Sequence, residues 1–107
     1  MDRVFDVDRS RCDGQARLRF VGELDLYESN RAQAEVVEVL DQTAGTLTID
    51  LRDLTFCDSS CVHLLLAIHS EASARGRKMV LQGPSAAAEK VLRICGVYDL
   101  FTVEDEA

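Results

Sequence analysis

The feature that most constrains this fold is the alternation between two hydrophobic periods along the chain. Residues 46–51, Thr-Leu-Thr-Ile-Asp-Leu, are rich in β-branched side chains and form a segment too short for a helix, so they predict a buried strand. On either side, residues 30–40 carry apolar residues at helical spacing, while residues 62–75 begin with a nearly continuous apolar run, which predicts a helix that packs deep in the domain. A strand between two helices indicates a parallel sheet, because parallel neighbours require a crossover connection.

Further segments extend this pattern in both directions. The expected elements are, in order, strands 4–8 and 16–22, helix 30–40, strand 46–51, helix 62–75, strand 78–82, a helix after Gly83-Pro84, and a strand at 101–103. The first two strands are joined by a turn at residues 12–14, in a connection that looks longer than two residues. The order β-β-α-β-α-β-α-β predicts an α/β fold, in which a mixed sheet has an antiparallel N-terminal edge and helices packed on it.

Local patterns predict where two of the helices begin. Asn30 with Gln33 three residues later resembles a capping box, so we expect the first helix to begin at Asn30. Gly83-Pro84 predicts a helix with proline in its first turn. The buried stripe expected for that last helix consists of Ala88, Val91, Leu92 and Cys95.

Length and composition indicate one domain, residues 1–107, with enough apolar residues for a single core. No apolar run approaches the roughly 20 residues of a membrane span, and the N-terminus lacks a signal-peptide pattern, so we expect no membrane span and a cytoplasmic location. The net charge of −7 argues against direct nucleic-acid binding, because phosphate backbones are met by basic patches.

The cysteines and histidines do not predict a cofactor or a metal. Cysteines 12, 57, 61 and 95 form no CxxC pair, so we expect reduced thiols rather than a disulfide framework. Cys57, Cys61, His63 and His69 lack the spacing of a zinc site. The sequence also contains no G-x-S-x-G turn around Ser59, no P-loop and no dinucleotide fingerprint, and we expect a protein that is not an enzyme.

The most informative stretch is Cys57-Asp58-Ser59-Ser60-Cys61, which lies between the predicted central strand and the next helix. Functional crevices of such sheets lie beyond the carboxyl ends of parallel strands. Ser59 falls near a helix N-terminus, where unpaired N–H groups and the helix dipole favour negative charge. Asp58 and Ser60 are equally well explained as helix caps, which stabilise by about 1 kcal/mol.

Two short segments carry a family resemblance. Gly22-Glu23-Leu24-Asp25 before one helix and Asp58-Ser59-Ser60 before the next resemble turns of the STAS domain of bacterial anti-sigma factor antagonists. The similarity continues through residues 76–78, 83–85 and 91–101, so it covers most of the chain. The resemblance implies a STAS-like fold and a regulatory protein that controls transcription through a sigma factor.

In that family the first serine of the second turn, here Ser59, matches the residue phosphorylated by the partner anti-sigma factor, a serine kinase. The resemblance implies that the unphosphorylated protein binds this kinase and so frees a sigma factor. The phosphorylated protein is released, and a phosphatase acting on phospho-Ser59 restores binding. It also implies a partner-binding surface of Asp25, Asp58, Ser60 and Cys61, in which we expect Asp58 to orient the Ser59 hydroxyl. Asp25 is almost equally well explained as a helix-start or turn residue.

Cys61 stands where the family usually has glycine. A thiol in the first turn of a helix is expected to have a lowered pKa, which makes Cys57 and Cys61 a candidate redox pair, although such cysteines are more often small and inert. The cysteine pair leaves a thiol redox sensor open as an alternative function. A second alternative comes from the family resemblance: the chain also resembles the STAS subunit of a lipid-transporting ABC system, which binds an ATPase. A homodimer is compatible with each of these functions.

Overall fold

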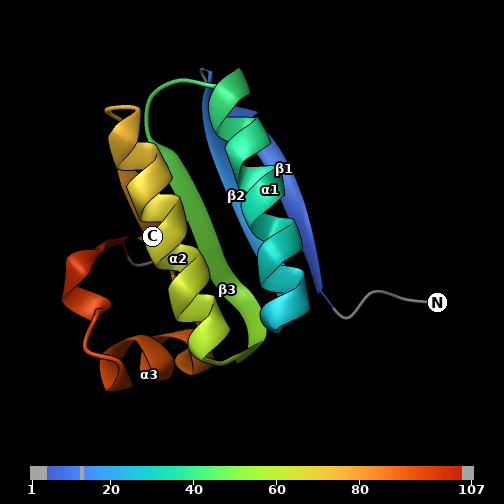
Figure 1. The fold of residues 1–107 in the computed structure, drawn as a ribbon, viewed down its shortest axis with the longest axis vertical. Helices are drawn as coiled ribbons and strands as arrows, with labels where there is room; N and C mark the ends of the chain where they lie inside the picture. The colour runs from blue at the N-terminus through green and yellow to red at the C-terminus, as the bar shows by residue number, and fades with distance from the viewer. Residues whose placement is uncertain (1–4, 13, 105–107) are drawn as a thin grey trace.

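The computed structural model of the protein describes residues 5–12 and 14–104. Within these residues the chain forms one five-stranded mixed sheet with three α-helices (Figure 1). The elements are β1 (Phe5–Cys12), β2 (Gln15–Leu24), α1 (Leu26–Gln42), β3 (Leu47–Cys57), α2 (Ser59–Ala74), β4 (Met79–Gln82), α3 (Ala86–Ile94), the 3-10 helix η1 (Tyr98–Leu100) and β5 (Thr102–Glu104). The strands lie in chain order; β1 is antiparallel to β2, and the other neighbours are parallel. The predicted α/β fold is confirmed.

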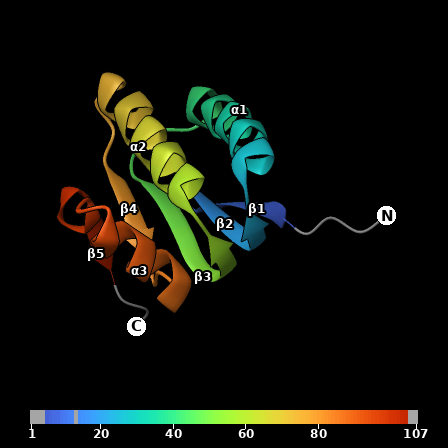
Figure 2. The same ribbon diagram turned by 60° about the horizontal axis from the view of Figure 1, so that its bottom comes forward.

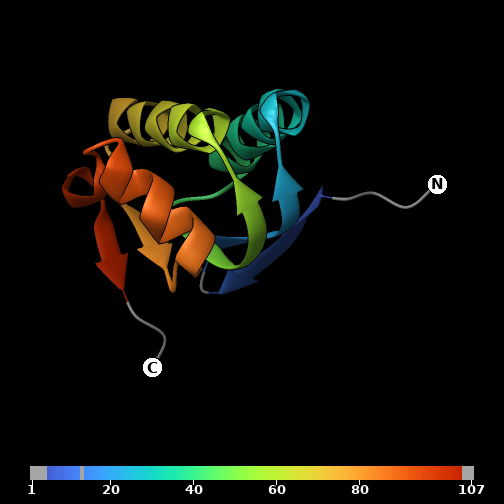
Figure 3. The ribbon, with the colours of Figure 1, turned by 90° about the horizontal axis from the view of Figure 1, so that it is seen from below.

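Helices α1 and α2 lie side by side on the same side of the sheet (Figures 1 and 3). The strands turn alternate residues towards these helices, because successive side chains of a strand point to opposite faces. From β2 these are Ala16, Leu18 and Phe20, and from β3 they are Leu47, Ile49 and Leu51, all of which are buried. The core therefore lies between the sheet and the helix pair.

Helix α2 is apolar around most of its circumference because it has neighbours on several sides. It packs against α1, against α3, and against β3 and β4 (Figure 2). Its buried residues are Ser60, Cys61, Val62, Leu64, Leu65, Ile68 and Ala72. The prediction that this helix packs deep in the domain is confirmed.

Three predicted boundaries near the carboxyl ends of β2 and β3 are wrong. Helix α1 begins at Leu26 and not at Asn30, and its N-cap is Asp25. Strand β3 continues to Cys57, and α2 begins at Ser59 rather than at Val62. Both helices begin with residues that do not follow the apolar stripe, so hydrophobic periodicity detects each helix only after its first turn.

Corrections elsewhere concern turns and caps. Cys12 pairs with Gln15, so the hairpin connection has two residues and not more; Val4 and Asp13, which belonged to the predicted strand and turn, lie outside the described residues. Helix α3 is capped by Ser85, so Pro84 precedes the cap instead of occupying the first turn. Ala88 and Leu92 are buried as predicted, but Cys95 is exposed because it follows the last residue of α3.

One buried charge lies on the sheet face opposite to the helices. The Asp50 side chain is fully buried, and its Oδ2 accepts hydrogen bonds from Nη2 of Arg17 at 2.5 Å and Nη2 of Arg52 at 2.7 Å. Burial raises the pKa of the Asp50 carboxyl, but the hydrogen bonds from Arg52 and the charges of both arginines outweigh it, so that the pKa lies below its usual value. The carboxylate is thus held ionised by two cations.

We expect Asp50→Asn to destabilise the protein in a pH-dependent way. The stabilisation from a lowered folded-state pKa is complete above the unfolded value of about 3.9 and is lost as the pH falls through the folded value. The difference in free energy of unfolding between wild type and variant should therefore shrink below about pH 4. Urea unfolding at several pH values measures it, with the exposed Asp99→Asn as control. A difference that stays constant into acid would contradict the prediction.

Leu65→Ala should lower the free energy of unfolding by about 2–5 kcal/mol, because Leu65 on α2 is completely buried and its truncation leaves a cavity. Ser70→Ala on the same helix is the matched control: Ser70 is exposed, and its substitution should change stability by less than about 0.5 kcal/mol. Chemical denaturation of the two variants side by side checks both values.

Candidate functional site

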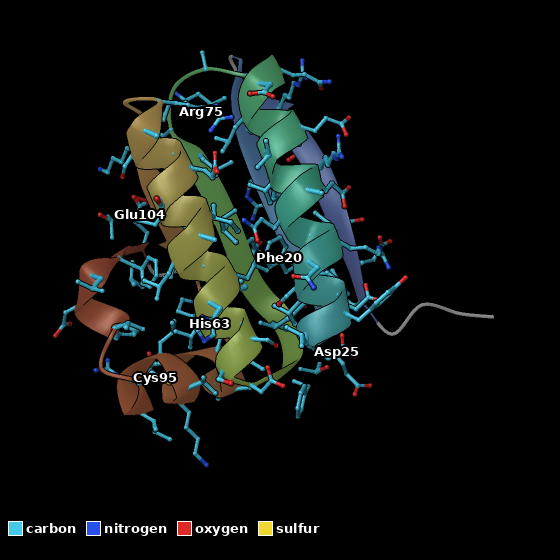
Figure 4. The ribbon with its side chains drawn as sticks, viewed as in Figure 1. Phe20, Asp25, His63, Arg75, Cys95 and Glu104 are labelled. Carbon is cyan, nitrogen blue, oxygen red and sulfur yellow. The ribbon has the colours of Figure 1, made fainter. Side chains whose placement is uncertain are left out.

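The two strand-to-helix junctions after β2 and β3 lie next to each other. Leu24, the last residue of β2, pairs with Cys57, the last residue of β3. The next residue in each case is an aspartate, and Asp25 and Asp58 are the N-caps of α1 and α2. Figure 4 shows Asp25 at the lower end of α1, far from Arg75 at the opposite end of the helix pair. Two helix N-termini, each with its positive dipole end, therefore meet at one edge of the sheet.

Asp58 organises the first turn of α2. Its Oδ1 accepts hydrogen bonds from the backbone N–H of Ser60 at 2.9 Å and from the Ser60 hydroxyl, while its carbonyl oxygen accepts one from the N–H of Cys61 at 3.0 Å. Ser59 is exposed at the first position of the helix, whereas Ser60 is buried. The expected contact of Asp58 with the Ser59 hydroxyl is not present among the described residues; the carboxylate binds the following serine instead.

A buried hydrogen bond joins the two helix starts. The Ser29 hydroxyl donates to the backbone carbonyl of Ser60 at 3.1 Å, while the Ser29 N–H donates to the carbonyl of Asp25 at 2.8 Å and the N–H of Glu28 to Asp25 Oδ1 at 2.9 Å. Sequence reasoning missed Ser29. Once α1 is known to begin at Leu26, the spacing of Ser29 from Ala32, three residues later, places both residues on the buried face.

Exposed apolar side chains surround this edge and were also missed. Leu26 and Tyr27, in the first turn of α1, are 67% and 70% exposed, and Phe56, near the end of β3, is 46% exposed. We call the exposed residues of the two junctions the junction surface: Asp25, Leu26, Tyr27, Phe56 and Ser59. Large apolar side chains left in water around a polar group are typical of a surface that binds another protein.

The cysteines of the site behave differently from the prediction. Cys57 is half-buried and Cys61 is buried, and both are free thiols. The neighbouring Cys57 thiol, burial, and the charges of Cys57 and Asp58 raise the pKa of the Cys61 thiol far above its usual range. The expectation that the helix dipole lowers this pKa is therefore wrong. Of the predicted partner-binding residues, Asp25 is exposed and Asp58 half-buried, while Ser60 and Cys61 face inward.

Other features of the described residues do not compete with this site. No three His, Cys, Asp or Glu side chains among residues 5–12 and 14–104 are grouped so that they could hold a metal ion. No helix in the described part of the chain combines the length and apolar character needed to cross a bilayer. His63 and His69 are exposed on α2, as expected for solvated histidines.

A surface cleft of about 480 Å³ is lined by Arg17, Arg19, Arg52 and Asp53, none of which belongs to the junction surface. Its positive charge is neutralised locally, because Arg17 and Arg52 bind Asp50, while Arg19 binds Asp53 at 2.6 Å and Asp8 at 3.4 Å. An anion entering this cleft would have to displace these ion pairs. We therefore take the junction surface as the candidate site.

The family model described as "Mlab, STAS domain" matches residues 7–102 of the chain. The chain belongs to the STAS domain family. This STAS domain is also 32% identical over 81 residues to an anti-sigma F factor antagonist of Lysinibacillus sphaericus, and the match covers 75% of this chain and 69% of the relative. The family resemblance drawn from residues 22–25 and 58–60 is thereby confirmed.

Solved structures agree with this assignment. The STAS domain superposes with a TM-score of 0.79 on the anti-sigma factor antagonist SpoIIAA in its unphosphorylated form, at 26% identity over 96% of this chain and 88% of the other. A second match is the Bacillus cell fate determinant SpoIIAA in the phosphorylated form, with a TM-score of 0.74 at 25% identity over 96% and 91% of the two chains. Two of these three relatives are named as antagonists of anti-sigma factors, which is a regulatory activity.

The two caps should differ in their contribution to stability. Asp58→Ala removes the partner of two Ser60 groups, and the Ser60 hydroxyl is then left buried, so we expect a loss of about 2 kcal/mol. Asp25→Ala removes the single acceptor for the Glu28 N–H and should cost about 1 kcal/mol. Asp58→Asn is the control, because asparagine caps helices about as well as aspartate. Thermal or urea unfolding of the three variants ranks them; equal losses for Asp58→Ala and Asp58→Asn would contradict this account.

Proposed function

We propose that this STAS domain is an anti-sigma factor antagonist that is switched by phosphorylation of Ser59. The observation that carries the proposal is the exposure of Ser59 at the first position of α2, on a surface where two helix N-termini meet exposed apolar side chains. It is supported by the likeness to SpoIIAA, which has been solved in an unphosphorylated and a phosphorylated form.

The proposed partner is an anti-sigma factor with serine kinase activity, encountered in the cytoplasm. The apolar side chains of Leu26, Tyr27 and Phe56 would be covered in the complex, and a few buried residues, tyrosine prominent among them, supply most of the binding energy of protein interfaces. Ser59 lies on the same surface, so a kinase bound there can receive its hydroxyl without unfolding α2. While this complex lasts, the sigma factor is free.

Phosphorylation of Ser59 adds a charge of about −1.5 to −2 at neutral pH. Within the STAS domain this charge is tolerated, because it lies at the positive end of the α2 dipole. In the complex it is unfavourable, since Asp25 and Asp58 are already present at the same edge and the phosphate must be desolvated. The phosphorylated protein therefore leaves its partner until a phosphatase removes the phosphate.

Substitutions at Ser59 separate binding from switching. Ser59→Ala should keep partner binding and abolish phosphorylation, whereas Ser59→Asp should weaken binding at least about tenfold, or about 1.4 kcal/mol. Ser70→Asp adds the same charge to an exposed position farther along α2 and should leave affinity unchanged. Affinities measured by calorimetry with the co-purified partner test this; equal weakening by both aspartates would mean that net charge and not the site is responsible.

The partner itself is identified by affinity purification of the protein from its own cells, combined with phosphopeptide mapping. We expect an anti-sigma kinase to co-purify and phosphate to be found on Ser59. Recovery of an ABC ATPase, with Ser59 unmodified under every growth condition, would instead favour the STAS subunit of a lipid-transport system and overturn the proposal.

A further inference from the structure

Two thiols flank the turn that carries Ser59. Cys57 is the last residue of β3 and Cys61 lies in the first turn of α2, so the segment between them is Asp58-Ser59-Ser60. Both thiols are free, and both cysteines contact the same atom: the carbonyl oxygen of Asp58 lies 3.9 Å from Cys57 Sγ and accepts a hydrogen bond from the Cys61 N–H at 3.0 Å. The phosphorylation proposed above uses neither of them.

The two thiols differ in accessibility in the way that a redox pair requires. Cys57 is partly exposed, whereas Cys61 is buried. An accessible cysteine with a second thiol next to it is typical of redox-sensitive sites, because the second thiol captures the first oxidation product. The exposed Cys95 at the end of α3 lies far along the chain from this pair and provides an internal comparison.

We propose that Cys57 and Cys61 form a reversible disulfide on exposure to a peroxide, and that this bond prevents phosphorylation of Ser59. The second half of the proposal rests on the proposed function, whereas the disulfide itself does not. The oxidant that forms the disulfide is a hydroperoxide, and the reductant that reverses it is a dithiol.

The reaction balances in two steps. The Cys57 thiolate attacks one oxygen of hydrogen peroxide, the O–O bond breaks, and Cys57 becomes a sulfenic acid with release of one water. The Cys61 sulfur then attacks the Cys57 sulfur, the S–O bond breaks, and a second water leaves with the Cys61 proton. In sum, two thiols and one peroxide give one disulfide and two waters, with two electrons passing to the peroxide. A dithiol returns these two electrons by thiol–disulfide exchange.

The disulfide would change the shape of the phosphoacceptor turn. The bond draws the two sulfur atoms to about 2 Å, while Cys57 is fixed by its pairing with Leu24 in the sheet. The adjustment therefore falls on residues 58–60 and on the bonds that Asp58 makes to Ser60. Phosphoryl transfer needs the acceptor hydroxyl within a narrow range of positions, and a displacement of about 1 Å can cost about 100-fold in rate.

The first experiment tests the disulfide without any partner. The purified protein is treated with a small excess of hydrogen peroxide, alkylated and analysed by peptide mass spectrometry. We expect a Cys57–Cys61 link that a dithiol reverses, that is unchanged in Cys95→Ser, and that is absent in Cys57→Ser and Cys61→Ala. A Cys57 sulfinic acid beside a free Cys61, or a link to Cys12 or Cys95 instead, would overturn the proposal.

The second experiment follows over time the fraction of Ser59 that carries phosphate in cells, with and without a peroxide pulse, and so gives the rate at which phosphate appears. In wild type we expect the rate at which phosphate appears on Ser59 to fall at least about tenfold, and in Cys57→Ser to stay within about twofold of its own untreated value. An equal fall in both would show that peroxide acts elsewhere. A complete lack of phosphate on Ser59 in untreated cells would overturn the proposed function and the regulatory half of this inference, while the disulfide found in the first experiment would stand.

Discussion

The pairing of Leu24 with Cys57 determines the arrangement of the site. Because β2 and β3 are parallel and end at the same level, their helices must begin side by side, and each helix places its capping aspartate at the same edge of the sheet. A slip of β3 by one residue against β2 would turn its buried side chains to the opposite face, so the core that holds the register also holds Asp25 next to Asp58. The candidate site is thus a consequence of how the two strands are aligned.

Two opposing electrostatic effects meet at the edge of the sheet that carries Asp25 and Asp58. Two helix N-termini favour a negative group, but two aspartates already satisfy part of that preference, within a chain of net charge −7. In the switch that we propose, a phosphate on Ser59 would therefore be acceptable to the STAS domain and unfavourable for a partner that must cover it. Such a change would be local, and it would alter binding without requiring a second conformation of the fold.

Much of the fold could be predicted from the sequence because its elements have distinct hydrophobic periods. Residues 46–51 and 62–75 are recognisable as a buried strand and a buried helix, and the position of Ser59 at a helix start follows from their order. The start of α1 could not be found in this way, since Leu26 and Tyr27 are apolar and yet exposed. Cys61 was misjudged for another reason: the neighbouring Cys57 thiol and burial raise its pKa, and burial depends on how α2 packs, which local sequence does not show.

The bond between the Ser29 hydroxyl and the Ser60 carbonyl has a consequence for how Ser59 can be recognised. It ties the first turn of α2 to the first turn of α1, so that one helix start cannot fray without breaking a buried contact of the other. Ser59 is therefore not presented as a flexible loop that an enzyme can draw into a groove. An enzyme acting on it must fit a preformed surface made by two segments about 30 residues apart, and a linear peptide spanning residues 55–63 lacks half of what such an enzyme would read.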